Sequence, residues 1–212
     1  MFSAFSVGLT GGVGSGKSSI AMMLSSHGAG IVDADTIAHQ LTSRGGAAIG
    51  ALRDSYGTEA IAVDGSLDRP RMRARVFSDP AARSQLESLL HPMIRNTMRE
   101  RAAELLERGS QYVVFVVPLL VETGSWHGSV DRVLLIDCSE ATQIARVCAR
   151  AGIDETMARK IVATQATRQQ RLSAADDVLI NEAPLDQLAD RVERLHRVYL
   201  RSAAMKRSHE TL

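Results

Sequence analysis

Short, continuously apolar segments recur along the chain and are separated by longer stretches with helical periodicity. The apolar segments are rich in β-branched residues, which is typical of strands. They lie at residues 5–10, 30–33, 112–117, 132–137 and 177–181. Because strands buried on both faces read as unbroken apolar runs, the pattern predicts an α/β fold with a five-stranded parallel sheet flanked by helices.

The gap between the second and third predicted strands, residues 34–111, is unusually long. Helical periodicity occurs around residues 72–77 and again over 91–108. A crossover between parallel strands needs only a dozen or so residues, so the gap predicts an inserted helical subdomain. His91 precedes Pro92, a residue that favours the first turn of a helix, so the long helix is expected to start there.

A shorter insertion, residues 138–176, lies between the fourth and fifth strands, and we interpret it as a lid. Helices are expected over residues 139–149 and 154–165. The segment after it should begin a helix at Pro184. Its apolar positions share one helical face, which should pack on the sheet: Leu185, Leu188, Val192, Leu195 and Tyr199. The core of this single domain then comprises residues 1–33, 112–137 and 177–212.

The composition is that of an ordinary globular protein, with 45% hydrophobic and 23% charged residues. The 25 basic and 24 acidic residues nearly cancel, which argues against a nucleic-acid partner. The longest apolar run, residues 112–121, is shorter than the ~20 residues that a membrane helix needs. The first basic residue is Lys17, which does not fit a secretory signal, so we expect a cytoplasmic protein without a membrane partner. Cys138 and Cys148 are expected to be buried, apolar and unpaired.

Positive charge is concentrated in the two insertions. Residues 69–108 carry nine basic and five acidic groups, and residues 138–175 carry six and three, whereas residues 1–68 carry three and six. A ligand with several phosphates would be attracted to such regions. Solvated helix faces rich in arginine explain the same counts equally well.

A phosphate-binding motif, G-x-x-x-x-G-K-S, runs from Gly11 to Ser18, directly after the first strand and before a helical stretch. Glycines allow successive backbone N–H groups to turn toward phosphates, and the helix N-terminus adds a positive dipole. Lys17 should reach the β- and γ-phosphates of ATP, and the Ser18 hydroxyl should bind Mg²⁺. The residues expected to bind the nucleotide phosphates are Gly11, Gly12, Val13, Gly14, Ser15, Gly16, Lys17, Ser18 and Ser19.

The motif alone does not identify the reaction, but other patterns narrow it. The chain has neither the N-K-x-D of GTPases nor the L-S-G-G-Q of ABC-type ATPases, which favours a small-molecule kinase. Asp33 closes the second strand, and ligands of open α/β sheets bind beyond the carboxyl ends of the strands. Asp33 and Asp35 would point the same way in an extended segment, so that one accepts a hydroxyl proton while the other holds substrate. Alternatively, they cap the next helix, with Asp35 capping Thr36 to Leu41.

At this point the sequence resembles the dephospho-CoA kinase family, on five blocks that occur in the family's order. They are G-L-T-G-G-V-G-S-G-K-S from Gly8, D-A-D-x-I-A from Asp33, L-H-P-M-I from Leu90, V-P-L-L-V-E from Val117 and A-T-Q-I-A-R from Ala141. The segment 163–177, with Q-A-T-R and R-L-S-A-A-D-D, resembles the end of the lid in bacterial members. The resemblance implies a P-loop NTPase core, a helical CoA-binding subdomain and a lid. It also implies transfer of phosphate from ATP to the ribose 3′-hydroxyl of dephospho-CoA.

The resemblance implies specific roles for individual residues. Asp33 would be the general base, Lys17 and Ser18 the phosphate and Mg²⁺ ligands, and Arg146 the lid residue that meets the transferred phosphoryl group. Thr10 would face the reacting groups. His91 would belong to the CoA-binding subdomain.

Three further residues are less certain from the sequence. Arg150 lies one helical turn after Arg146 and either points into the cleft or is solvated. Glu122 follows the third strand and either faces the CoA or binds a lid arginine. The family commonly has Asp-Asn at the end of the last strand, near the adenine, where this chain has Ile180 and Asn181; the contact expected from the acid is therefore in doubt, whereas Asn181 remains a candidate.

Two other functions stay open on the sequence alone. A kinase for shikimate, gluconate or a nucleoside would use the same loop but would not need so large a helical insertion. A P-loop regulator would bind nucleotide without phosphorylating a metabolite. We expect ATP and dephospho-CoA as the partners, and a monomer or a small homo-oligomer.

Overall fold

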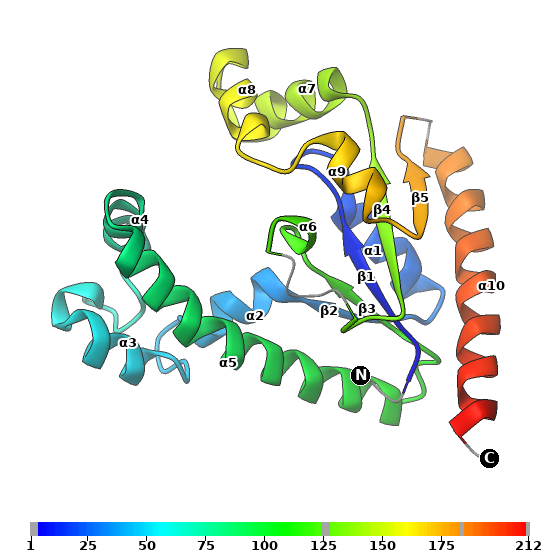
Figure 1. Cartoon of the computed structure of the whole chain (residues 1–212), viewed down its shortest axis with the longest axis horizontal. Helices are drawn as coiled ribbons and strands as arrows, with labels where there is room; N and C mark the ends of the chain where they lie inside the picture. Colours follow the sequence, from blue (N-terminus) through cyan, green and yellow to red (C-terminus); the bar gives the residue numbers. More distant parts are fainter. Residues whose placement is uncertain (1–3, 124–127, 183–184, 211–212) are drawn as a thin grey trace. The chain divides into compact units, whose positions relative to one another are not determined.

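A computed structural model describes residues 4–123, 128–182 and 185–210 of the 212-residue chain. Five strands form one sheet in the order β2-β3-β1-β4-β5 (Figure 1). The strands are β1 (Ser6–Thr10), β2 (Gly30–Asp33), β3 (Val113–Val116), β4 (Arg132–Asp137) and β5 (Asp177–Ile180). β1 pairs in parallel with β3 and β4, and β4 pairs in parallel with β5. The predicted five-stranded parallel sheet is confirmed, with each strand within one residue of its expected bounds.

The chain divides into two compact units, which we call the sheet unit (Met1–Val32 and Ala102–Leu212) and the helical unit (Asp33–Arg101). The helices of the sheet unit are α1 (Lys17–Ser26), α6 (Leu120–Thr123), α7 (Glu140–Ala151), α8 (Glu155–Ala163), α9 (Arg168–Ser173) and α10 (Leu185–Glu210). The helical unit contains α2 (Ala34–Leu41), α3 (Ile49–Tyr56), a 3₁₀ turn (Thr58–Ala60), α4 (Arg69–Ser78) and most of α5 (Pro80–Glu107).

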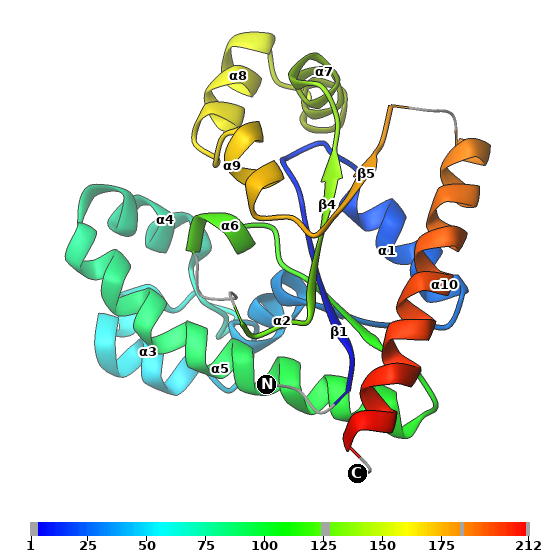
Figure 2. The same ribbon diagram turned by 45° about the vertical axis from the view of Figure 1, so that its right-hand side comes forward.

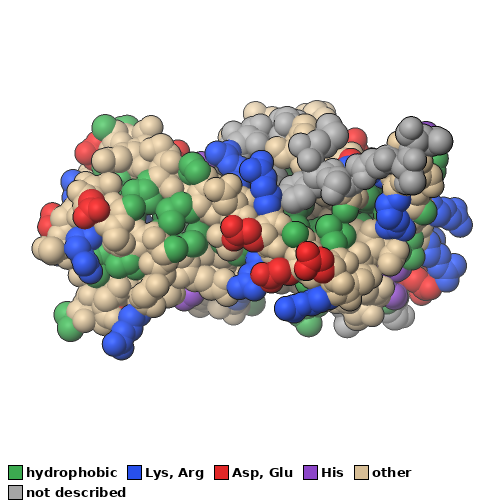
Figure 3. Space-filling model, turned by 90° about the horizontal axis from the view of Figure 1, so that it is seen from below, with side chains coloured by type: hydrophobic (Ala, Val, Ile, Leu, Met, Phe, Trp, Pro, Cys, Tyr) green, Lys and Arg blue, Asp and Glu red, His purple; other side chains and the backbone are tan. Residues whose placement is uncertain are grey.

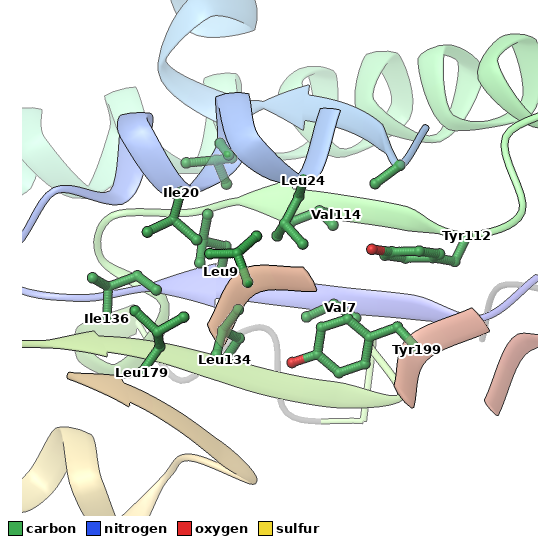
Figure 4. Close-up of a cluster of buried hydrophobic side chains, with 14 of the residues drawn as sticks. Val7, Leu9, Ile20, Leu24, Tyr112, Val114, Leu134, Ile136, Leu179 and Tyr199 are labelled. Carbon is green, nitrogen blue, oxygen red and sulfur yellow. The ribbon is translucent and has the colours of Figure 1, made fainter. Parts of the chain in front are cut away.

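Helices α1 and α10 lie side by side on one face of the sheet and bury its apolar side chains. Ile20 and Leu24 of α1 pack against the central strand β1, and Tyr199 of α10 lies beside Val7 (Figure 4). All of these side chains are fully buried. The apolar face that the sequence predicted for the last helix therefore packs on the sheet at Leu188, Val192, Leu195 and Tyr199, whereas the side chain of Leu185 lies outside the described part. Pro184, expected to be its first residue, lies outside the described residues.

On the other face, Leu120 of α6 approaches the backbone of Gly8 so closely that a Cβ there would lie 2.7 Å from its Cδ1. The glycine in the middle of β1 thus lets α6 pack directly on the central strand. Helices α7, α8 and α9 follow β4 and group together beyond its end (Figure 2). Their own small core joins Ile144, Val147 and Ala158.

The helices of the predicted lid begin where side-chain caps satisfy their first backbone N–H groups. Ser139 caps α7 by accepting from Thr142 N, and Asp154 caps α8 by accepting from Met157 N. Cys138 is buried, as expected, whereas Cys148 is only half-buried, and both are free cysteines. The expectation of a buried cysteine is therefore confirmed for Cys138 and wrong for Cys148.

The long helix of the insertion starts earlier than the sequence analysis predicted. α5 begins at Pro80, where the carboxylate of Asp79 accepts hydrogen bonds from the N–H groups of Ala81 (2.9 Å) and Ala82 (3.1 Å). His91 and Pro92 lie inside the helix, so Pro92 does not mark its start. In the described part of the chain no helix, including the long α5 and α10, is both long and apolar enough to cross a bilayer.

Candidate nucleotide-binding site

The predicted phosphate loop connects β1 to α1 with the backbone conformation that only glycine adopts easily. Gly14 has φ +73° and Gly16 has φ +93°, both in the left-handed region. Ser15 N donates to Gly12 O over 3.1 Å, which closes the turn, and Gly16 O receives Ile20 N from the first turn of α1. The loop thus leads into the N-terminus of α1, where backbone N–H groups are available for an anion.

The loop glycines are also required because other elements approach the backbone closely. A Cβ on Gly12 would lie 2.6 Å from Oε1 of Gln143, and one on Gly14 would lie 2.7 Å from the Gln143 carbonyl oxygen. A Cβ on Gly16 would collide with the side-chain amide of Asn181. Gln143 lies on α7 and is 3% exposed. It belongs to the A-T-Q-I-A-R block, but the sequence analysis assigned it no role.

Lys17 and the two serines after it lie at the start of α1. Lys17 Nζ donates to the carbonyl oxygens of Gly11 (2.7 Å) and Gly12 (3.1 Å), so its charge lies over the loop. Ser18 and Ser19 are exposed. Ser15 is buried, and its hydroxyl has no hydrogen-bond partner within the described residues. The exposed Ser18 hydroxyl is an oxygen ligand of the type that Mg²⁺ takes together with phosphate oxygens.

Arg146 and Asn181 connect the loop to α7 and to the end of β5. Arg146 donates to the carbonyl oxygens of Gly14 (3.3 Å) and Asn181 (3.1 Å). The buried side-chain amide of Asn181 donates to Ser15 O over 2.7 Å. The structure therefore places Arg146 at the loop, and it uses the Asn181 amide to hold the loop. Arg150 is exposed near the end of α7.

The segment between α8 and α9, residues 164–167, which we call the lid-exit segment, contacts both the loop and α6. The side-chain oxygen of Gln165 accepts from Val13 N over 2.8 Å, and the Glu122 carboxylate accepts from Ala166 N over 2.9 Å. Glu122 thus binds the backbone of the lid-exit segment. The segment borders a cavity of about 680 Å³, lined by Val121, Glu122, Thr164, Gln165, Ala166, Gln169, Gln170, Ser173 and Ala174.

Thr10, the last residue of β1, is fully buried, and its hydroxyl donates to Pro118 O over 3.3 Å. Its described contact is therefore with the backbone that follows β3. A second buried group follows β4. The Asp137 carboxylate forms a two-pronged ion pair with Arg168 of α9, with a closest distance of 2.6 Å. This hydrogen bond raises the pKa of the Arg168 guanidinium, and the pair ties α9 to the sheet.

Glu182 follows Asn181 and supports the start of α7. Its carboxylate accepts hydrogen bonds from the Ser139 N–H and, over 2.7 Å, from the Thr142 hydroxyl. The backbone hydrogen bond from Ser139 lowers the pKa of Glu182, and the Thr142 bond acts in the same direction. Burial raises the pKa of the Cys138 thiol, so this cysteine is not an activated nucleophile.

In the helical unit, Asp33 is the N-cap of α2. Its carboxylate accepts from Thr36 N over 2.8 Å. Asp35 is exposed in the first turn of the helix and is not the cap. The expectation that Asp35 caps a helix starting at Thr36 is therefore wrong, as is the expectation that the two carboxylates project together from an extended segment, because residues 34–36 are helical. His91 is half-buried within α5.

The loop with its lysine, placed between β1 and α1 of a parallel sheet of order 2-3-1-4-5, defines a P-loop kinase. A model of the dephospho-CoA kinase family matches residues 5–187, and the chain belongs to this family. The dephospho-CoA kinase of Cupriavidus pinatubonensis is 49% identical over 194 residues, which is 91% of this chain and 93% of the relative. That of Burkholderia thailandensis is 52% identical, covering 94% and 98%. The crystal structure of TT1252 from Thermus thermophilus is 30% identical, with a TM-score of 0.78 over 91% of this chain and 96% of that one.

Proposed function

We propose that the chain transfers the γ-phosphoryl group of ATP to the ribose 3′-hydroxyl of dephospho-CoA, which yields coenzyme A and ADP in the last step of coenzyme A synthesis. The observation that carries the proposal is the phosphate loop in a chain that the dephospho-CoA kinase family matches over residues 5–187. In the reaction, the bond between the γ-phosphorus and the β–γ bridging oxygen breaks, and the 3′-oxygen forms the new bond to phosphorus. The proton of the hydroxyl passes to a base.

Lys17 and Arg146 supply the positive charge for this transfer. Both donate to carbonyl oxygens of the loop backbone, Lys17 to Gly11 and Gly12 and Arg146 to Gly14. Phosphoryl transfer passes through a loose transition state, so stabilising charge on the phosphoryl oxygens matters more than removing the hydroxyl proton. An arginine in this position is worth ~10³ or more in rate in related P-loop enzymes.

Mg²⁺ fits the loop as a bound partner of ATP. The exposed Ser18 hydroxyl in the first turn of α1 provides one protein oxygen. No group of three or more His, Cys, Asp or Glu side chains that could hold a metal occurs among the residues the structure describes. In nucleotide sites, Mg²⁺ usually binds phosphate oxygens and water together with one or two protein oxygens. When bound, the ion neutralises charge on the β- and γ-phosphates.

Asp33 is the proposed general base. It is the last residue of β2, and ligands of open α/β sheets bind beyond the carboxyl ends of the strands. One of its oxygens accepts from Thr36 N, which fixes the side chain at the N-terminus of α2. That contact orients the carboxylate, and we assign its other oxygen to the 3′-hydroxyl.

On the substrate side, we assign the CoA moiety to the helical insertion, which includes His91, and the lid to residues 138–176. Asp35 at the start of α2 and Arg150 on α7 are the exposed candidates for contacts with dephospho-CoA. Glu122 is proposed to act through the lid-exit backbone. Thr10 is proposed to face the reacting groups, and its hydroxyl bond to Pro118 O would then hold it in place.

The proposed enzyme works in the cytoplasm on small molecules. On the face shown in Figure 3, a group of acidic side chains lies among basic ones, and the formal net charge is +1. Nothing in this distribution favours a polyanionic polymer over a metabolite.

An ADP-release assay that compares dephospho-CoA, shikimate, gluconate and a nucleoside tests the proposal. Only dephospho-CoA should stimulate release. Stimulation by another acceptor would reassign the substrate, and no stimulation by any of the four would favour a nucleotide-binding regulator.

The roles of Asp33 and Lys17 are separated by binding and turnover measured on the same variants. Asp33→Asn should slow turnover by at least about 100-fold, the usual worth of a general base, with ADP affinity nearly intact. Lys17→Ala should lower both the turnover rate and the ADP affinity. If the two variants lose equal ADP affinity, these assignments are wrong.

A further inference from the structure

The phosphate loop donates a backbone hydrogen bond to a side chain outside the loop motif. Gln165, in the lid-exit segment, accepts from the Val13 N–H over 2.8 Å, across 152 residues of sequence. We propose that Gln165 is a positioning residue, which holds the tip of the loop in the conformation that binds the nucleotide phosphates. The inference rests on the nucleotide site proposed above and adds to it a residue that contacts the loop rather than the ligand.

The tip of the loop is held at three points by the lid helices and the segment that follows them. The Val13 side chain packs into the small lid core with Ile144 and Val147. The Gly14 carbonyl accepts from Arg146 on α7. The bond from Val13 N to Gln165 is the third contact and fixes the peptide plane before Val13.

The lid-exit segment is rigid enough to hold the loop, because its own backbone is fixed on both sides of Gln165. The Gln165 N–H donates to the carbonyl oxygen of Val162 at the end of α8. The next residue, Ala166, donates to Glu122 over 2.9 Å, and its carbonyl oxygen accepts from the buried guanidinium of Arg171. Gln165 therefore extends from a backbone that is already held by α6, α8 and α9.

The chemistry of the contact explains why it should affect binding. A loop that binds phosphates through backbone N–H groups must hold several of them in one orientation. If the tip samples other conformations, the apparent affinity for nucleotide falls in proportion to the fraction of molecules that keep the binding conformation. Because a side chain to backbone hydrogen bond is worth about a 3- to 10-fold change in an equilibrium, its removal should weaken nucleotide binding by that factor.

Gln165→Met tests this inference because methionine keeps the length and bulk of glutamine but lacks the acceptor oxygen. The matched control is Gln187→Met, the same change on the exposed side of α10. ADP binding is measured by calorimetry, and kcat and the KM values for ATP and dephospho-CoA are measured by ADP release. Gln165→Met should raise the Kd of ADP and the KM of ATP about 3- to 10-fold, with kcat and the KM of dephospho-CoA within about twofold. Gln187→Met should leave all four within about twofold.

Three results would overturn the inference. Unchanged ADP affinity in Gln165→Met would show that the bond does not position the loop, and tighter binding would show that it holds a conformation that ATP must displace. A fall in kcat with an equal rise in both KM values would indicate a general distortion of the site and would also count against it. If the wild-type chain failed to bind ADP, the proposed function itself would be wrong.

Discussion

The approach of Gln143 to the phosphate loop makes a quantitative test possible at Gly12. A Cβ at this position would lie 2.6 Å from Oε1 and 3.1 Å from Nε2 of Gln143. The φ of Gly12 lies outside the left-handed region, so alanine can adopt its backbone conformation without strain. The cost of Gly12→Ala therefore comes from overlap with one side chain. Gln143 is 3% exposed, so it has little room to move away.

Such overpacking usually costs about 1–3 kcal/mol. In a chain of this size each kcal/mol corresponds to about 2–4 °C in the thermal midpoint, so Gly12→Ala should lower the midpoint by roughly 3–10 °C. Gln143→Ala removes the overlapping atoms at a cost of its own. The double variant Gly12→Ala/Gln143→Ala should therefore be more stable than the sum of the single effects predicts, by at least about 1 kcal/mol.

Gly14→Ala provides the matched control. Its Cβ would meet the backbone carbonyl of Gln143 at 2.7 Å, and Gly14 has φ +73°. Gln143→Ala leaves that backbone in place, so it should not rescue Gly14→Ala. Urea unfolding of the five variants gives the coupling energies. Additive effects for Gly12 and Gln143, or equal rescue of Gly14→Ala, would refute the reasoning.

Two further predictions concern sites away from the loop. Burial, with a smaller contribution from the neighbouring His27, lowers the pKa of His196 from 6.5. The unfolded chain therefore binds the proton more readily, and the free energy of unfolding should fall as pH drops below about 6.5. In urea unfolding from pH 5 to 7.5, His196→Gln should flatten this part of the profile, and an unchanged slope would contradict the prediction. Asp33→Ala should lose about 0.5–2 kcal/mol of stability because it removes the N-cap of α2. Asp33→Asn keeps an acceptor for Thr36 N and should lose less. Equal stability of the two variants in urea unfolding would show that the Asp33 cap does not stabilise α2.

The sheet and the loop could be predicted because their signals are local. Each buried strand is an unbroken apolar run of a few residues, and the loop motif directly follows one of them, so neither required knowledge of distant contacts. The starts of α7 and α8 were predicted to within one residue, at Ser139 and Asp154, and the structure shows that these two residues are the N-caps.

The start of α5 was missed because two proline signals competed. Pro80 follows Asp79, an N-cap residue directly before a proline at the first helical position, which is the stronger signal for a helix start. Pro92 lacks only one N–H, and a helix of 28 residues accommodates that loss within its length. The same kind of local competition placed the cap of α2 on Asp33 rather than on Asp35.

The residues that hold the loop could not be found from periodicity. Asn181 and Ser15 are separated by 166 residues, and Gln165 and Val13 by 152. Gln143, Gln165 and Asn181 all lie within or next to blocks that resemble the family. However, a pattern match does not state which backbone atom a side chain reaches. Only the fold brings the start of α7, the lid-exit segment and the end of β5 to the same loop.

Apart from Arg146, the side chains that support the loop from outside share one chemical property that follows from its task. Gln143, Gln165 and Asn181 are neutral amides, which contact the loop backbone without adding charge. A carboxylate in place of Gln165 could accept from Val13 N equally well. However, a unit charge about 6 Å from a phosphate oxygen would oppose binding by roughly 3 kcal/mol at an effective dielectric constant of about 20. In the proposed site, the positive charge at the loop comes from Lys17 and Arg146, which donate to backbone carbonyl oxygens of the loop.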